Sequence, residues 1–175
     1  DIELPSGPNL RKATASALAR LAEGNGMVVA AVRFPWCDKC KEKDRHFAKA
    51  ARESRDKDHL RNVVFVSVDA REEKYLARRH NITCSDQCSL LIFKQDEPGE
   101  PYSVPGRRYH EEVHIDCYKH LLPVVSVVED KETFGRVTSA FDTAIVGFFR
   151  GAKEEDTWYP RFRAVARQLR GHALF

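Results

Sequence analysis

Two almost uninterrupted apolar runs constrain the fold of this chain more than any other feature. They are Met27–Val32 and Val63–Val68, and polar or turn residues border both. A run of roughly six residues without regular polar alternation is typical of a strand buried on both faces of a sheet. Such strands occur in α/β folds, so the runs predict a sheet with helices on both sides.

Helical patterns alternate with these runs. In the first part of the chain, we expect helices over Leu10 to Glu23, Cys37 to Ser54, Glu72 to His80 and Glu111 to Leu121. A third strand is expected over Ser89–Phe93, and a short hairpin strand over Tyr102–Val104 follows the turn at 98–101.

Pro123 marks a predicted domain boundary, because the strand–helix order restarts after it. Strands are expected over 124–128, over 144–149 and from Ala173, with helices over 129–139 and 157–169. The pattern predicts a first domain of residues 1–122. Residues 123–175 hold about half the length of a typical domain.

Charge and hydropathy exclude two classes of partner. The net charge is +3, and acidic and basic residues are mixed along the chain, whereas a nucleic-acid binder clusters its basic residues. No apolar run approaches the roughly 20 residues of a membrane-spanning helix. We therefore expect no nucleic-acid partner and no membrane span, and oligomeric state is left open.

A pair of cysteines, Cys37 and Cys40, follows the first buried run directly and opens the predicted helix. The positive end of a helix dipole favours a thiolate at this position. Cys37 is expected at the exposed helix start as the nucleophile. Cys40, one turn deeper, would resolve a mixed disulfide by attacking Cys37. A redox dithiol explains this placement better than two inert buried cysteines.

The residues around the pair would tune its reactivity. Asp38 should oppose thiolate formation and Lys39 should favour it, so the two charges roughly cancel. Trp36 precedes the pair. No organic cofactor is needed, because the electrons reside on the cysteine sulfurs.

The segment from Val28 through Trp36-Cys37-Asp38-Lys39-Cys40 to Lys41 resembles the strand and active-site helix of the protein disulfide isomerase family. Further stretches are similar in the family's order, namely Val66–Ala70, Asn81-Ile82-Thr83, Leu90–Lys94, Gly106-Arg107, Pro123–Ser126 and Ala144–Phe149. The resemblance covers nearly the whole chain.

This resemblance implies a thioredoxin fold, a central mixed sheet flanked by helices. Residues 123–175 would be the N-terminal part of a second, redox-inactive thioredoxin-like domain. It also implies thiol–disulfide exchange on cysteine-containing protein substrates, and Arg107 as the counterpart of a family arginine that lowers the resolving thiol's pKa; a surface arginine is the equal alternative. The endoplasmic reticulum lumen is implied as the compartment, although the chain shows neither a signal peptide nor a retrieval signal.

Three positions depart from the family pattern. The family places a cis-proline before the third strand, where Cys88 falls here; Ala31 takes the place of a buried glutamate; and Arg45 takes the place of a helix proline. We therefore expect exchange chemistry to be retained and isomerisation to be less efficient.

Cys84 and Cys88 are possible auxiliary thiols. They could form a local disulfide or stay free, which we rank first, or serve a supplementary redox role. As a third interpretation, they could join Cys37 and Cys40 in a four-thiolate site for zinc or an iron–sulfur cluster. That third case would suit a non-catalytic redox-sensing or chaperone-like binding module, the alternative to an enzyme.

The other potential metal ligands are weaker candidates. His110 and His114 are four residues apart on an expected helix, without an evident third ligand, so we expect them to be solvent-exposed. Cys117 is expected to be a small buried apolar residue.

Overall fold

The structure is a computed structural model that describes residues 10–84, 89–97, 99–104, 106, 109–128, 130–139, 143–149, 156–170, 173 and 175. Contacts divide the chain into two units, residues 1–118 and 119–175. Each unit is described by itself.

The first unit is built on a five-stranded mixed sheet with the order β1-β3-β2-β4-β5. The strands are β1 (Leu10–Lys12), β2 (Met27–Arg33), β3 (Val63–Asp69), β4 (Leu90–Lys94) and β5 (Tyr102–Val104). β3 is parallel to both β1 and β2, whereas β4 is antiparallel to β2 and β5. The two apolar runs therefore form neighbouring inner strands of the sheet, as predicted.

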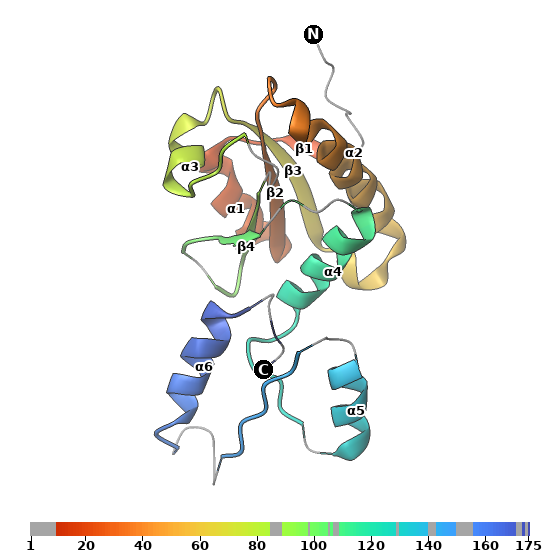
Figure 1. Cartoon of the computed structure of the whole chain (residues 1–175), viewed down its shortest axis with the longest axis vertical. Coiled ribbons are helices and arrows are strands. Elements are labelled where there is room, and N and C mark those ends of the chain that lie inside the picture. Colours follow the sequence, from red (N-terminus) through yellow and green to blue (C-terminus); the bar gives the residue numbers. More distant parts are fainter. Residues whose placement is uncertain are drawn as a thin grey trace. The chain divides into compact units, whose positions relative to one another are not determined.

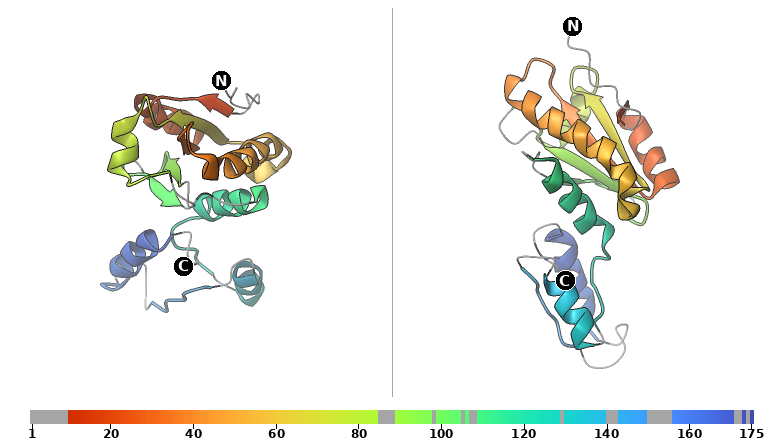
Figure 2. Two further views of the ribbon diagram at one scale, coloured as in Figure 1. Left: turned by 45° about the horizontal axis from the view of Figure 1, so that its top comes forward. Right: turned by 90° about the vertical axis from the view of Figure 1, so that its right-hand side faces the viewer.

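Helices cover both faces of this sheet (Figures 1 and 2). α1 (Ala15–Asn25) and α3 (Lys74–Arg79) lie on one face, and α2 (Asp38–Glu53) and α4 (His110–Leu121) lie on the other. Two short 3-10 helices, Ser54–Asp56 and Asp58–Leu60, connect α2 to β3. The predicted α/β class and the thioredoxin-type arrangement are confirmed.

Apolar side chains pack on each face of the sheet. On the first face, buried residues of α1, α3, β2 and β3 form one core, which includes Leu18, Val32 and Leu76. On the opposite face, the Phe47 ring of α2 packs edge-on against Phe65 of β3, with 5.6 Å between the ring centroids. This contact packs α2 against the sheet.

The N-terminal segment differs from its prediction. The apolar spacing predicts a helix from Leu10, but Leu10–Lys12 form β1, which pairs with Phe65–Ser67 of β3. Helix α1 begins only at Ala15, after the Thr14 N-cap, and ends at Asn25, before the C-cap Gly26, whose φ is 80°. Leu10, Arg11 and Lys12 are compatible with either a helix or a strand, and pairing with the edge of β3 makes them a strand.

The second unit contains α5 (Lys131–Ser139) and α6 (Tyr159–Gln168), close to the predicted helices. The strands expected over 124–128 and 144–149 do not form in the described residues. Instead, the Ser126 amide donates to the Phe175 carbonyl at 2.7 Å, and an isolated bridge joins Arg170 and Ala173. Among the described residues, no helix is long and apolar enough to cross a membrane.

Candidate functional site

Cys37 and Cys40 lie where β2 passes into α2. Cys37 is the N-cap of α2, with a φ of −90°, and Cys40 lies in the first helical turn. The Cys37 amide donates to the Phe34 carbonyl at 2.8 Å, and the Cys40 amide donates to the Cys37 carbonyl at 3.2 Å. These bonds hold both cysteines at the positive end of the helix dipole.

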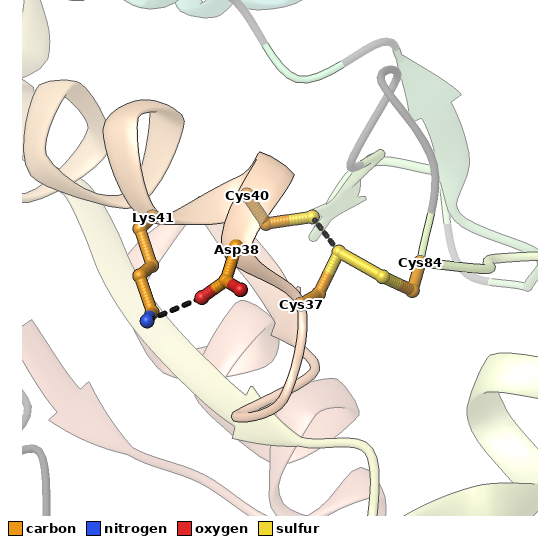
Figure 3. Close-up of a disulfide and its surroundings, with 5 residues drawn as sticks. All are labelled: Cys37, Asp38, Cys40, Lys41 and Cys84. Atoms are coloured by element: carbon orange, nitrogen blue, oxygen red, sulfur yellow. Dashed lines mark hydrogen bonds and ion pairs between the residues drawn. A yellow bond between two sulfur atoms is a disulfide. The ribbon is translucent and has the colours of Figure 1, made fainter.

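Three sulfur atoms converge at this helix start (Figure 3). Cys37 forms a disulfide with Cys84, with 5.5 Å between the Cα atoms. The Cys40 Sγ lies 3.1 Å from the Cys37 Sγ. Cys37 is therefore the central sulfur, within reach of both other cysteines. The prediction that Cys84 is free or bonded locally to Cys88 is wrong, because the fold brings Cys84 to the dithiol instead.

The exposure of Cys37 also differs from its prediction. An exposed helix start is expected from the sequence, but Cys37 is only 2% exposed, as is Cys40. Phe34 packs against the two cysteines, and Cys84 is bonded to Cys37 while remaining exposed itself. The nucleophile candidate is thus covered in this disulfide-bonded state.

The end of α3 positions Cys84. The Ile82 amide donates to the Ala77 carbonyl at 2.9 Å, the Asn81 amide donates to the Arg78 carbonyl at 3.1 Å, and Asn81 has a φ of 51°. This is a Schellman motif, which ends a helix with a defined change of direction. Because Ile82 is buried in the core, the chain reaches Cys84 from a fixed point.

The charges beside the dithiol are arranged differently from the predicted Asp38–Lys39 balance. Asp38 forms an ion pair with Lys41, one turn along α2. The hydrogen bond from Lys41, and then its charge, lower the pKa of Asp38. Trp36 is 59% exposed, and its ring packs edge-on against Phe34.

A second ion pair ties α2 to the strand that precedes it. Arg33 at the end of β2 donates to Asp44 of α2, with an Nε–Oδ2 distance of 2.9 Å, and both side chains are largely buried. Burial raises the pKa of the Asp44 carboxyl, while Arg33 opposes that shift. The pair brackets the cysteine segment, and sequence reasoning missed it because no local pattern links positions 33 and 44.

The histidines of α4 are packed rather than solvated, so the prediction that they are exposed is wrong. His114 is 6% exposed, and its Nε2 lies 2.9 Å from the Ala50 carbonyl of α2. His110 packs against the ring of His46, and its Nε2 lies 3.2 Å from a carboxylate oxygen of Glu53. Cys117 is fully buried, as predicted, and burial strongly raises the pKa of its thiol.

Two predicted site residues, Cys88 and Arg107, lie outside the described residues. Ala31 is buried in β2, where it pairs with Ser67 and Leu90, so the site lacks a carboxylate at that position. Arg45 lies within the continuous helix α2. In the described part of the chain, no group of three or more histidine, cysteine or acidic side chains is arranged to hold a metal ion.

Comparison with known proteins agrees with this geometry. The sequence matches the Thioredoxin family over residues 12–115. It is 28% identical to a protein disulfide-isomerase of Aspergillus niger over 86% of this chain, and 30% identical to one of Arthroderma benhamiae over 85% of this chain. The chain spans 27% and 26% of these two relatives, respectively.

Two solved structures share the fold. The first thioredoxin domain of mouse Protein disulfide-isomerase A4 has a TM-score of 0.55 at 18% identity, covering 76% of this chain and 93% of that domain. Human ERp44 form II has a TM-score of 0.60 at 16% identity, covering 99% of this chain and 47% of that protein. With its mixed sheet, flanking helices and family match, this chain belongs to the thioredoxin family, and its sequence relatives include protein disulfide isomerases.

Proposed function

We propose that the chain catalyses thiol–disulfide exchange on protein substrates, with Cys37 as the nucleophile and Cys40 as a resolving thiol. The observation that carries the proposal is the position of Cys37 as N-cap of α2, with the Cys40 Sγ 3.1 Å from its own sulfur. A thiolate is favoured at a helix N-terminus, and a neighbouring thiol can then displace the bound substrate.

Isomerase activity is a narrower part of this proposal. The protein disulfide-isomerase relatives support it, and they also support the endoplasmic reticulum lumen as the compartment. The alanine at position 31 argues for weaker isomerisation than simple exchange, because Ala31 cannot transfer protons to or from the dithiol.

We further propose that residues 123–175 are the N-terminal part of a second, redox-inactive thioredoxin-like domain. The similarity of the whole chain to ERp44 supports this, as does the contact boundary at residues 118–119.

Insulin reduction by the purified chain, with dithiothreitol as the reductant, tests the exchange activity. We expect Cys37→Ser to abolish the acceleration over dithiothreitol alone. Cys117→Ala, which removes a buried thiol away from the start of α2, should leave it unchanged. Equal activity of Cys37→Ser and the parent chain would refute the role of Cys37.

The burial of Cys37 favours one alternative, a redox-sensing module that does not turn over. Its disulfide with Cys84 covers the nucleophile candidate. A chain that binds unfolded substrate or stoichiometric zinc, but shows no exchange after full reduction, would support that alternative.

A further inference from the structure

We propose that Cys84 is a second resolving thiol for Cys37. This inference rests on the proposed function, because it requires Cys37 to form a mixed disulfide with substrate. It assigns to Cys84 a catalytic role that competes with that of Cys40.

The position of Cys37 carries the first step of the argument. Its sulfur is bonded to Cys84 and lies 3.1 Å from the Cys40 Sγ. Exchange requires a thiolate to reach the sulfur that it attacks. Both cysteines satisfy this requirement at the same target atom (Figure 3).

The anchoring of Cys84 carries the second step. The Schellman motif at Asn81 and the buried Ile82 hold the chain two residues before Cys84. A thiol held near its target reacts faster than one on an unrestrained segment, because less orientational freedom is lost. Cys84 is also exposed, so its thiol has access to solvent for proton exchange when reduced.

The reaction balances without an added oxidant. Cys37 thiolate attacks a substrate disulfide, forms a Cys37–substrate bond and releases the first substrate sulfur as a thiolate. Cys84 thiolate then attacks the Cys37 Sγ, the Cys37–Cys84 bond forms, and the second substrate sulfur leaves as a thiolate that takes a proton from water. The substrate disulfide gains two electrons, and Cys37 and Cys84 together lose two.

Glutathione disulfide is a suitable probe for this step. The reduced variants Cys40→Ser/Cys88→Ser and Cys40→Ser/Cys84→Ser would be mixed with it, quenched with acid and mapped by tandem mass spectrometry. Both variants lack Cys40. The first retains Cys84 as a candidate resolving thiol, and the second retains Cys88. Circular dichroism would check folding, and Cys40→Ala would replace Cys40→Ser if the serine disturbs the buried site.

We expect Cys40→Ser/Cys88→Ser to form the Cys37–Cys84 disulfide. Cys40→Ser/Cys84→Ser should instead accumulate at least about tenfold more Cys37–glutathione adduct, because its resolving thiol is gone. Equal accumulation of the Cys37–glutathione adduct in both variants would overturn the role of Cys84. Release of glutathione from Cys37 as fast in Cys40→Ser/Cys84→Ser as in Cys40→Ser/Cys88→Ser would overturn it as well. Absence of any Cys37 adduct or Cys37 disulfide in both variants would overturn the proposed function itself and this inference with it.

Discussion

Cys37 has a different environment from the one that its sequence position suggests. The pattern of a buried strand followed by two spaced cysteines correctly predicts that both lie at the start of a helix. The pattern could not indicate that Cys37 is buried, because its partner Cys84 lies 47 residues away in sequence and reaches Cys37 only through the fold. Of the interpretations for Cys84, the four-thiolate hypothesis places it beside the dithiol. The interpretation ranked first, a local disulfide with Cys88 or free thiols, is wrong for Cys84.

The Asp38–Lys41 pair leads to a prediction at the same scale. Lys41 partly compensates the Asp38 charge, so Asp38→Asn should raise the alkylation rate of reduced Cys37 at pH 7 by less than about threefold. Lys41→Gln should lower that rate, because the Asp38 charge that opposes the thiolate then loses its Lys41 partner. Iodoacetamide kinetics with peptide mapping measure both, and the differences should shrink at high salt. A rate decrease in Asp38→Asn would contradict this role.

At the scale of elements, most helices and strands of the first unit follow from the sequence. The central runs, the hairpin strand Tyr102–Val104 and the helices after the runs form close to their predicted bounds. The exceptions depend on distant partners. Leu10–Lys12 becomes a strand because β3 offers an edge to pair with, and His114 is buried because α4 packs on α2.

The Arg33–Asp44 pair should stabilise the junction between β2 and α2. Asp44→Ala leaves the largely buried Arg33 without its partner, so we expect a loss of about 1–3 kcal/mol in the free energy of unfolding. Urea denaturation measures this loss. The exposed pair of Arg61 and Asp58 offers a matched control, since Asp58→Ala should change stability little.

A double-mutant cycle would identify the cause. If the ion pair acts as a unit, the losses from Asp44→Ala and Arg33→Met should not add in the double variant. Strict additivity would show that the two side chains stabilise the fold separately.

The packing of His114 predicts a stability change with pH. Burial lowers the pKa of His114 below its usual 6.5, and nearby Lys57 and His110 lower it further. The hydrogen bond to the Ala50 carbonyl and the nearby Glu53 raise this pKa, but they oppose the lowering only in part. The unfolded chain therefore binds protons more readily, and stability should fall as the pH drops from about 7.5 through 6.5 and below. His80, whose pKa burial also lowers, acts in the same direction.

Thermal unfolding between about pH 7.5 and 5.5 tests this prediction. His114→Gln should reduce the slope, whereas His59→Gln, at an exposed position, should leave it unchanged. An unchanged slope in His114→Gln would show that other groups cause the pH dependence.

At the scale of the whole molecule, the two units differ in how far sequence patterns predict them. The first unit has a complete sheet, and its central strands have partners on both sides. In the second unit, the described residues of 124–128 and 144–149 form no strand, and Ala144 takes part in an isolated bridge instead. A strand needs a partner for its backbone hydrogen bonds, so an apolar run alone does not make one.

The central claim, that Cys37 attacks substrate disulfides, is tested most directly by trapping. The reduced Cys40→Ser/Cys84→Ser variant would be incubated with insulin, quenched with acid, and mapped to find the cysteine that carries the insulin chain. We predict a mixed disulfide between Cys37 and insulin, and we expect it to be lost when the Cys37→Ser substitution is introduced into the same variant. Attachment at Cys88 instead, or a complex that persists without Cys37, would contradict the claim.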